Sequence, residues 1–317
     1  MAIKELYLAH TQGFCAGVVN AIDVVELCIK KYGVPLYVRH AIVHNTSVIQ
    51  DFELRGVVFI ESLSDVPDDQ VVVFSAHGTA PDVYERAQKR GLTIVDATCP
   101  LVTKVHRQAK RYCDRGTHIV LIGHRGHQEL IGTAGHIKPD LLHIVEDEAD
   151  VDALSLSPDA EIGVLTQTTL SVDDTAHIIQ KLQAKFQNII TGGKEDICYA
   201  TQNRQDAVKQ LAKQCDFIIV IGSANSSNSN RLVETAKLQG VESIISDLPE
   251  DVDETIFQTY ERVGVTSGAS VPSYLVERLV KRIQLLYPRV AIFKEESIEK
   301  DILFPLPKAV ADMRGKK

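Results

Sequence analysis

The sequence contains no tryptophan, and aromatic residues make up only 6% of its 317 residues. Few rings are therefore available to stack on nucleic-acid bases. The formal net charge of −8 at pH 7 argues in the same direction, because nucleic-acid-binding surfaces are basic. No apolar run reaches the roughly 20 residues of a membrane-spanning helix. We therefore expect a soluble globular chain that binds neither nucleic acid nor a membrane.

The N-terminus has no basic region followed by an apolar stretch, so it does not resemble a secretory signal. A cytoplasmic location is expected, and in that reducing compartment the six cysteines are not expected to form disulfides. The sequence also lacks a close cysteine pair of the CxxC type, which structural zinc sites usually contain. The cysteines therefore call for another explanation.

Apolar segments rich in valine and isoleucine alternate with helical patterns along the chain. Six of these segments are expected to be strands: 36–38, 71–75, 119–122, 162–166, 217–221 and 262–266. Buried parallel strands read as continuous apolar runs, so the alternation predicts an α/β fold with small, mostly parallel sheets flanked by helices. Helices are expected after Cys15, ending at Gly33, and after Cys99. Pro81 and Pro272 suit the first turn of two further helices.

Nine polar positions recur in a three-by-three order. Each of three segments opens with a cysteine just ahead of a helical pattern: Cys15, Cys99 and Cys198. A second polar position follows 29, 28 and 30 residues later: His44, His127 and Asn228. A third follows after a further 33, 41 and 42 residues: His77, Thr168 and Ser270. The repetition predicts three lobes converging on one centre, at 1–96, 97–194 and 195–286, with a C-terminal tail at 287–317.

The six cysteines fall into two classes. Three lie inside helical stripes and are expected to be buried core residues: Cys28, Cys113 and Cys215. The three that open the segments stand at helix starts, where the helix dipole favours the thiolate. We expect these three to share a metal centre. A 4Fe–4S cluster with three thiolate ligands leaves one iron open to bind a substrate oxygen and deliver electrons, whereas zinc is the lesser alternative.

The other array positions supply hydrogen-bond donors without a lysine. Ser226 and Ser227 add to them, in a run dense in hydroxyls and amides that follows the strand at 217–221. Such donors suit a compact, multiply charged anion such as a diphosphate, although one serine of the run is also expected to cap a helix. Glu129 is the only carboxylate within these clusters and is expected to donate a proton. Thr168 is expected to relay a proton or to orient a substrate hydroxyl.

The motifs resemble those of the 4-hydroxy-3-methylbut-2-enyl diphosphate reductases, the IspH or LytB family. The matching stretches run in order from residue 13 to residue 275: GFCAGV, YVRHAIVHN, FSAHG, DATCPLVTKVH, GHRGHQE, TQTTLSVDDT, DICYATQNRQ, GSANSSNSNRL and GVTSGAS. DATCPLVTKVH and SSNSNRL are individually specific, whereas FSAHG alone is weak. Two positions depart from the family pattern: Gln12 stands in place of arginine, and Gln128 in place of proline.

The resemblance implies three α/β lobes in pseudo-threefold arrangement around one central 4Fe–4S cluster with an open iron. It implies that the cluster is held by Cys15, Cys99 and Cys198. It implies that the diphosphate is held by His44, His77, His127, Ser226, Ser227, Asn228 and Ser270. Proton delivery and substrate placement fall to Glu129, Thr168 and His127.

The implied reaction is the reductive dehydroxylation of (E)-4-hydroxy-3-methylbut-2-enyl diphosphate to isopentenyl and dimethylallyl diphosphate, the last step of the non-mevalonate isoprenoid pathway. Reduced ferredoxin or flavodoxin is the implied electron donor. Two other classes of function are still compatible with the sequence. One is a redox-neutral iron–sulfur enzyme, such as a dehydratase or a quinolinate-synthase-like enzyme, although a carboxylate substrate calls for arginine forks and only Arg125 lies within a cluster. The other is an iron–sulfur sensor, which needs a partner surface that this acidic chain does not suggest.

Overall fold

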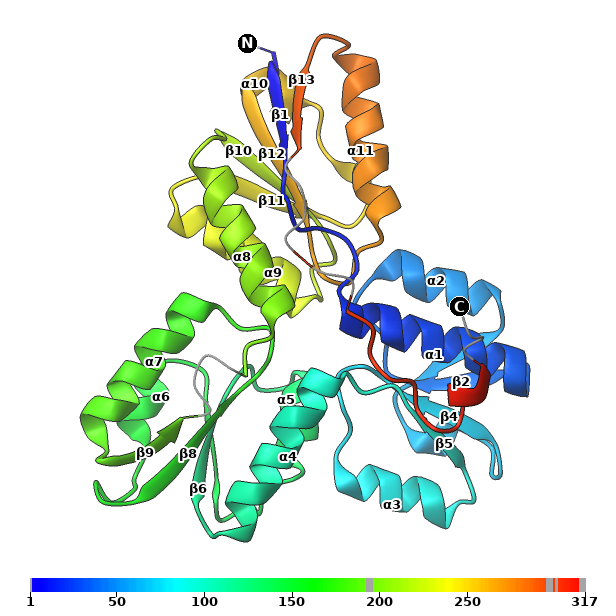
Figure 1. Ribbon diagram of the computed structural model, residues 1–317, viewed down its shortest axis with the longest axis vertical. Coiled ribbons are helices and arrows are strands. Elements are labelled where there is room, and N and C mark those ends of the chain that lie inside the picture. Colours follow the sequence, from blue (N-terminus) through cyan, green and yellow to red (C-terminus); the bar gives the residue numbers. More distant parts are fainter. Residues whose placement is uncertain (1, 192–195, 295–298, 300–301, 314–317) are drawn as a thin grey trace. The chain divides into compact units, whose positions relative to one another are not determined.

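The computed structural model describes residues 2–191, 196–294, 299 and 302–313. The chain divides into two compact units, and Figure 1 follows it from the N-terminus to the C-terminus. Unit 1 comprises Met1–Ala16, His44–Ser47 and Tyr199–Ile302. Unit 2 comprises Gly17–Val43, Val48–Cys198 and Leu303–Lys317.

Unit 1 contains one five-stranded sheet in which every pairing is parallel. Its strands, in spatial order, are β11 (Glu242–Ser246), β10 (Phe217–Ile221), β12 (Arg262–Ser267), β1 (Glu5–Leu8) and β13 (Ala291–Lys294). Its helices are α8 (Tyr199–Ala212), α9 (Ser227–Leu238), α10 (Thr255–Thr259) and α11 (Ser273–Leu286), with a 3₁₀ turn at Pro249–Asp251.

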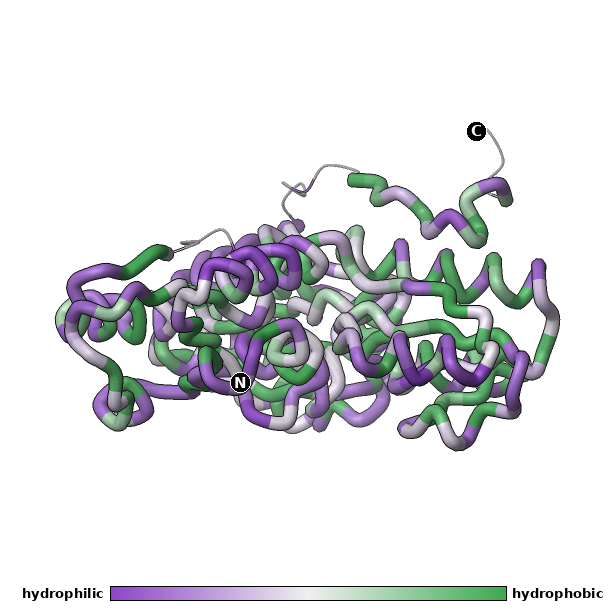
Figure 2. The backbone as a smooth tube through the Cα atoms, turned by 90° about the horizontal axis from the view of Figure 1, so that it is seen from below, coloured by the Kyte–Doolittle hydropathy of each residue, from purple (hydrophilic) through white to green (hydrophobic). Residues whose placement is uncertain are grey.

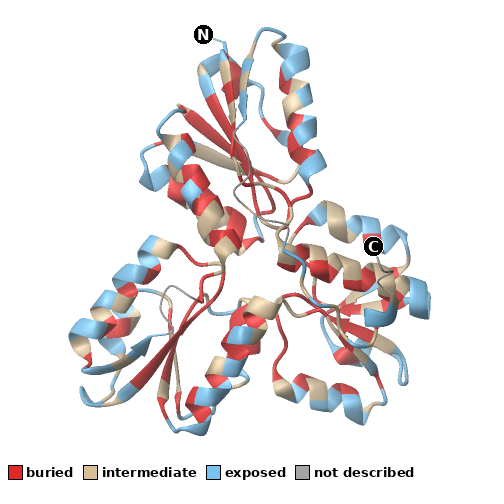
Figure 3. Ribbon diagram, viewed as in Figure 1, coloured by how far each residue is buried: buried red, intermediate tan, exposed pale blue. Residues whose placement is uncertain are grey.

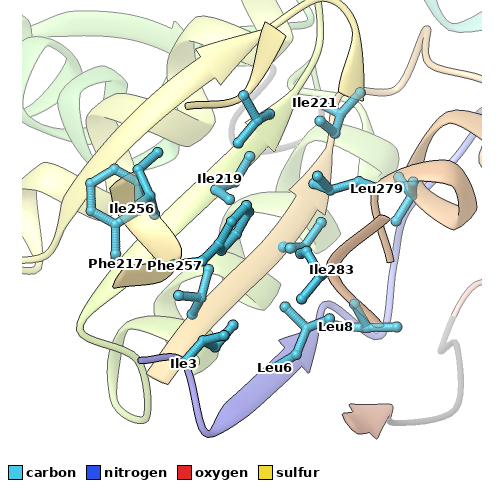
Figure 4. Packing of buried hydrophobic residues seen from close by; sticks show 14 of the residues in the cluster. Ile3, Leu6, Leu8, Phe217, Ile219, Ile221, Ile256, Phe257, Leu279 and Ile283 are labelled. Carbon is cyan, nitrogen blue, oxygen red and sulfur yellow. The ribbon is translucent and has the colours of Figure 1, made fainter. Parts of the chain in front are cut away.

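The core of unit 1 lies on both faces of this sheet. All five residues of β10 are buried, so its side chains alternate between two clusters. Phe217, Ile219 and Ile221 belong to one cluster with residues of α10 and α11, and Figure 4 shows Phe217 beside Ile256 and Leu279 near Ile221. The intervening residues of β10 pack against α8 and α9 on the other face. Burying each such side chain stabilises the fold by about 1.5–3 kcal/mol, which explains why the strand is apolar throughout.

Unit 2 contains two four-stranded parallel sheets. The first has the spatial order β3 (Val57–Ile60), β2 (Leu36–Arg39), β4 (Val71–Phe74) and β5 (Thr93–Asp96). It is accompanied by α1 (Ala16–Tyr32), α2 (Thr46–Leu54), α3 (Pro81–Lys89) and a 3₁₀ turn at Leu63–Asp65. The second has the order β7 (Leu142–Val145), β6 (His118–Ile122), β8 (Glu161–Thr166) and β9 (Asn188–Thr191). It is accompanied by α4 (Pro100–Asp114), α5 (Gln128–Ala134), α6 (Glu148–Ala153) and α7 (Val172–Lys185).

Local signals account for several helix ends. Gly33 has φ +78° and its N–H donates to the carbonyl of Ile29, so it terminates α1 as a left-handed cap. Pro81 occupies the first position of α3, where its missing N–H costs nothing. Pro272 instead lies one residue before α11, in the N-cap position. The expected helices after Cys15 and Cys99 are confirmed as α1 and α4.

The three sheets share one strand topology. Each sheet contains three consecutive strands of the chain in which the first lies between the second and the third: β2 between β3 and β4, β6 between β7 and β8, and β10 between β11 and β12. A fourth strand then pairs with the third: β5, β9 and β1 respectively. The six expected strands are confirmed, and so is the α/β class with three parallel sheets flanked by helices.

The fourth strand of the unit 1 sheet comes from the other end of the chain. We expected residues 1–96 to form one lobe, but β1 pairs with β12, in the register Leu8 opposite Val265. The expected tail at 287–317 contributes β13 to the same sheet. Further along, Val310 is fully buried, and the ammonium of Lys31 donates to the carbonyl of Ala309 at 2.6 Å. The expected boundary at 194–195, and tail positions 295–298, 300–301 and 314–317, lie outside the described residues.

Burial follows the strands and the inner faces of the helices, as Figure 3 shows. Figure 2 shows hydrophobic and hydrophilic residues interleaved along the helices. No helix in the described part of the chain is long and apolar enough to cross a membrane.

Candidate functional site

The nine array positions all follow the carboxyl ends of strands. In each sheet the first strand leads to one of His44, His127 and Asn228. The third strand leads to one of His77, Thr168 and Ser270. The fourth strand leads to one of Cys99, Cys198 and Cys15. Open α/β sheets bind ligands at this edge, beside the point where the strand order reverses, so the shared topology explains the sequence repeat.

The backbone of each of these cysteines is tied to the loop that follows the third strand of its sheet. The N–H of Cys15 donates to the carbonyl of Ala269 at 3.0 Å, and that of Cys99 to Ala76 at 3.0 Å. The N–H of Cys198 donates to Thr168 at 3.1 Å. The acceptor is the second residue after the strand in every case. This common register places Thr168 one position earlier in its loop than His77 and Ser270.

The two classes of cysteine are separated in burial. Cys28, Cys113 and Cys215 are buried, as predicted. Burial raises the pKa of the Cys28 and Cys215 thiols to about 12, so these thiols stay protonated.

The other three cysteines are half-buried and directly precede helices: Cys15 before α1, Cys99 as the N-cap of α4, and Cys198 before α8. Partly exposed thiols at helix N-termini are suited to bind a metal as thiolates. This donor chemistry fits an iron–sulfur cluster. Cys15 belongs to unit 1, and Cys99 and Cys198 to unit 2. No group of three or more metal-binding side chains is found among the described residues, so the ligand set remains a prediction.

Glu129 and Thr168 form a buried pair in unit 2. The side chain of Glu129 comes from the first turn of α5 and is only 3% exposed. Its Oε1 accepts a hydrogen bond from the Thr168 N–H at 2.6 Å, and its Oε2 accepts one from the Thr168 hydroxyl at 3.0 Å. Burial raises the pKa of Glu129 to about 7, and the two bonds from Thr168 oppose that rise. The carboxyl group can therefore hold or release a proton near neutral pH.

His127 caps α5 and has a defined tautomer. Its Nδ1 accepts a hydrogen bond from the Glu129 N–H at 3.1 Å. An accepting Nδ1 carries no proton, so the neutral ring is protonated on Nε2 and presents a donor on its far side. The His77 ring lies edge-on to it, with ring centroids 6.0 Å apart. His77, His127, Glu129 and Thr168 are thus brought together in unit 2.

The serine and asparagine positions of unit 1 are also connected. Ser226 is the N-cap of α9, and its hydroxyl accepts from the Ser229 N–H, which confirms the expected cap. Asn228 accepts from the Ala269 N–H at 2.9 Å. The Ser270 hydroxyl donates to the carbonyl of His44 at 2.8 Å. Ser270 therefore holds the His44 loop in this arrangement, while Ser227 occupies the first turn of α9.

The proposed residues divide equally between the two units. Unit 1 holds Cys15, His44, Ser226, Ser227, Asn228 and Ser270. Unit 2 holds His77, Cys99, His127, Glu129, Thr168 and Cys198.

Three buried polar residues beside these positions were missed by the sequence reasoning. Gln167 accepts from the His124 N–H and donates to the Thr169 hydroxyl, so it braces the loop that carries Thr168. Thr201 and Arg204 lie on α8 and are buried there. Their only sequence signal is their place within the stretch that follows Cys198.

Comparison with known proteins agrees with this geometry. Residues 6–284 match the LytB protein family. A 4-hydroxy-3-methylbut-2-enyl diphosphate reductase of Saccharophagus degradans is 47% identical over 307 residues, which cover 96% of this chain and 98% of that protein.

Two solved structures are similar as well. The structure of the E-1-hydroxy-2-methyl-but-2-enyl-4-diphosphate reductase of Plasmodium falciparum has a TM-score of 0.94 at 39% identity, covering 98% of both chains. A structure of (E)-4-hydroxy-3-methyl-but-2-enyl diphosphate reductase, the terminal enzyme of the non-mevalonate pathway, has a TM-score of 0.62 at 30% identity, covering 90% of this chain and all of that one. These matches support neither the redox-neutral enzyme nor the sensor. The chain therefore belongs to the LytB family, the 4-hydroxy-3-methylbut-2-enyl diphosphate reductases, and it is an oxidoreductase.

Proposed function

We propose that this chain reduces (E)-4-hydroxy-3-methylbut-2-enyl diphosphate at a 4Fe–4S cluster held by Cys15, Cys99 and Cys198. The family is iron–sulfur-dependent, and the three-cysteine ligand set is our assignment. Two electrons and two protons replace the allylic hydroxyl by hydrogen, with loss of water, and the products are isopentenyl and dimethylallyl diphosphate. A bound cluster with an open iron supplies the electrons and a Lewis-acid site for the substrate hydroxyl.

The diphosphate is assigned to side chains that donate hydrogen bonds. Seven residues form this set: His44, His77, His127, Ser226, Ser227, Asn228 and Ser270. The tautomer of His127 supports its place, because Nε2–H is the group that can donate to an anion. The N-terminus of α9 supports Ser226 and Ser227, since the first N–H groups of a helix attract phosphate.

Glu129 is assigned as the proton donor for the departing hydroxyl. A pKa near 7 keeps a large fraction of the carboxyl groups protonated at neutral pH, and the buried position removes competing water. Thr168 holds both carboxyl oxygens and so fixes the direction in which the proton leaves. The hydroxyl of Thr168 is assigned to orient the substrate oxygen when the proton is transferred.

The electron donor and the cellular location follow from the same chemistry. A one-electron carrier such as reduced ferredoxin or flavodoxin fits a centre that is reduced in single-electron steps. A cytoplasmic location fits the buried, unpaired thiols of Cys28 and Cys215, because such thiols persist in a reducing compartment.

The observation that carries this proposal is the equivalent placement of three cysteines after the fourth strand of three sheets with one topology. The test is to replace each of them by serine and to purify the protein anaerobically. Each variant is expected to lose iron, visible absorbance and turnover of the hydroxylated diphosphate. Cys28→Ser and Cys113→Ser are the matched controls, and both are expected to retain iron. Wild-type iron content in Cys15→Ser, Cys99→Ser or Cys198→Ser would contradict the assignment of that ligand.

A further inference from the structure

Unit 1 contains a closed ring of hydrogen bonds that begins and ends on α8. Thr201 and Arg204 lie three residues apart on this helix, so they share one face. Both side chains are buried, and Arg204 is fully buried. Arg204 donates the first hydrogen bond of the ring, and the hydroxyl of Thr201 accepts the last one. Neither residue is used in the reaction proposed above.

Arg204 binds the loop that carries Cys15. Its Nη2 donates to the carbonyl of Gly13 at 2.7 Å. Its Nη1 donates to the carbonyl of Ala200 at 2.9 Å and to Oε1 of Glu299 at 2.9 Å. A fully buried guanidinium has a large desolvation cost, so these contacts must offset it. The planar fork spans Gly13 and Ala200 at once, which a lysine ammonium cannot do.

Gly13 is held on both sides. Its N–H donates to the hydroxyl of Ser267 at 2.9 Å, and its carbonyl accepts from Arg204. It has φ +84°, a conformation that residues with a side chain rarely adopt. The turn two residues before Cys15 is therefore fixed by β12 on one side and by α8 on the other.

From Cys15 the ring continues through the loop that follows β12 to the first turn of α9. The Cys15 N–H donates to the carbonyl of Ala269, and the Ala269 N–H donates to Oδ1 of Asn228 at 2.9 Å. The amide Nδ2 of Asn228 donates to the hydroxyl of Thr201 at 3.3 Å, which returns the ring to α8. The N-terminal part of α8 thus contacts the loop of a proposed cluster ligand through Arg204 and a proposed diphosphate ligand through Thr201.

We infer that Arg204 and Thr201 are positioning residues: Arg204 sets the Cys15 thiolate and supplies a buried positive charge beside the cluster, and Thr201 sets Asn228. The inference rests on the proposed function, because it takes Cys15 as a cluster ligand and Asn228 as a diphosphate ligand. Outer partners of metal ligands typically change metal affinity or activity by about 10- to 100-fold when they are removed. The charge of Arg204 favours the reduced cluster, which carries one more negative charge than the oxidised one.

The first test uses anaerobically purified holoenzyme and follows loss of visible absorbance after addition of an iron chelator. Arg204→Lys and Arg204→Met are expected to lose the cluster about 10- to 100-fold faster than wild type. Arg278→Met is the matched control, because Arg278 lies on α11 of the same unit and forms an exposed ion pair with Glu250. A wild-type rate of cluster loss in both Arg204 variants would overturn the positioning role.

The second test measures the reduction potential of the cluster by redox titration with electron paramagnetic resonance. Arg204→Met removes a positive charge and is expected to lower the potential, whereas Glu299→Gln removes the neighbouring negative charge and is expected to raise it. Opposite shifts support the electrostatic role, since a purely structural disturbance has no reason to reverse sign. Shifts in the same direction, or none, would overturn it.

The third test asks whether Thr201 acts on substrate binding without affecting the cluster. Thr201→Val is expected to keep the iron content and raise KM for the hydroxylated diphosphate by about 10-fold, since Asn228 loses the hydroxyl that accepts from its Nδ2. Thr201→Ser is expected to restore KM. An unchanged KM in Thr201→Val would remove Thr201 from this role. A wild-type protein that binds no cluster would instead contradict the proposed function, so the two failures are distinguishable.

Discussion

Glu129 accepts two hydrogen bonds from a single residue, Thr168: one from the backbone N–H at 2.6 Å and one from the side-chain hydroxyl at 3.0 Å. Both carboxyl oxygens are therefore fixed by a loop that follows β8. The carbonyl of Thr168 also accepts the N–H of Cys198, so the proposed acid and a proposed cluster ligand are both hydrogen-bonded to one residue. A shift of the Thr168 backbone would therefore move both the Glu129 carboxyl group and the backbone of Cys198.

Replacing Glu129 by glutamine tests its role as the proton donor. Glu129→Gln keeps the size of the side chain but cannot deliver a proton, so kcat is expected to fall by about 10²–10⁴-fold. Iron content and the visible spectrum are expected to stay at wild-type values, because the side chain is not a proposed ligand. Steady-state kinetics under anaerobic conditions measure the loss. Undiminished turnover would exclude Glu129 from the proton path.

The pH profile tests the raised pKa of the same group. An acid that must be protonated is lost as pH rises through its pKa, so kcat/KM is expected to fall above pH of about 7. Conversely, full activity is expected on the acidic side of this value until other groups titrate. Kinetics between pH 6 and pH 9 measure this descending limb of the pH profile of kcat/KM. A flat profile across this range would contradict the assignment.

Thr168→Val removes the hydroxyl that bonds Glu129 and keeps the backbone N–H. Hydrogen bonds from Thr168 lower the pKa of Glu129, so their partial loss is expected to raise it further. The descending limb of kcat/KM is then expected to move to higher pH. Thr168→Ser keeps a hydroxyl and is the matched control. A limb at the same pH in the valine and serine variants would show that the hydroxyl bond does not set the pKa.

The sequence predicted the parts of the fold that repeat. The strand at 217–221 is apolar throughout because it is buried on both faces, and the structure confirms it as β10. The array positions were visible because each follows a strand end, and because the second position of each segment comes 28–30 residues after its cysteine. Strand ends and helix starts are local features, so one chain is enough to find them.

The sequence did not predict the long-range pairings. β1 and β13 have four residues each and lie at opposite ends of the chain, yet they pair with each other in one sheet. Nothing in a four-residue stretch specifies a partner almost 290 residues away. Arg204 was missed for a related reason: an arginine in a polar helix reads as a surface residue, and only tertiary contacts with Gly13 and Glu299 explain its burial.

His106 is expected to make unit 2 sensitive to acid. Burial, with a smaller contribution from the neighbouring His136 ring, lowers the pKa of His106 to about 3 from 6.5. The unfolded chain therefore takes up the proton first, and stability present above pH 6.5 is lost as pH falls toward 3. At pH 5 the loss amounts to about 2 kcal/mol.

His106→Met removes this titration, so its free energy of unfolding is expected to depend less on pH than that of wild type. Urea unfolding followed by circular dichroism at pH 7.5 and pH 5 measures the difference. His118→Met is a control, because that histidine lies on β6 and is less buried. Equal pH dependence in wild type and His106→Met would show that His106 is not responsible.

Gln128→Pro is expected to stabilise the protein. Gln128 is the first residue of α5, where proline fits and a missing N–H is not needed by the helix. The preceding residue, His127, has φ −70° and ψ 135°, the extended conformation that a following proline requires. Proline reduces the freedom of the unfolded chain, so the free energy of unfolding is expected to rise by about 0.4–1 kcal/mol. Urea unfolding of the variant measures this gain, and wild-type kcat shows that the His127 cap and Glu129 are undisturbed. A less stable variant would mean that the Gln128 N–H or side chain makes a contact that the helix start requires.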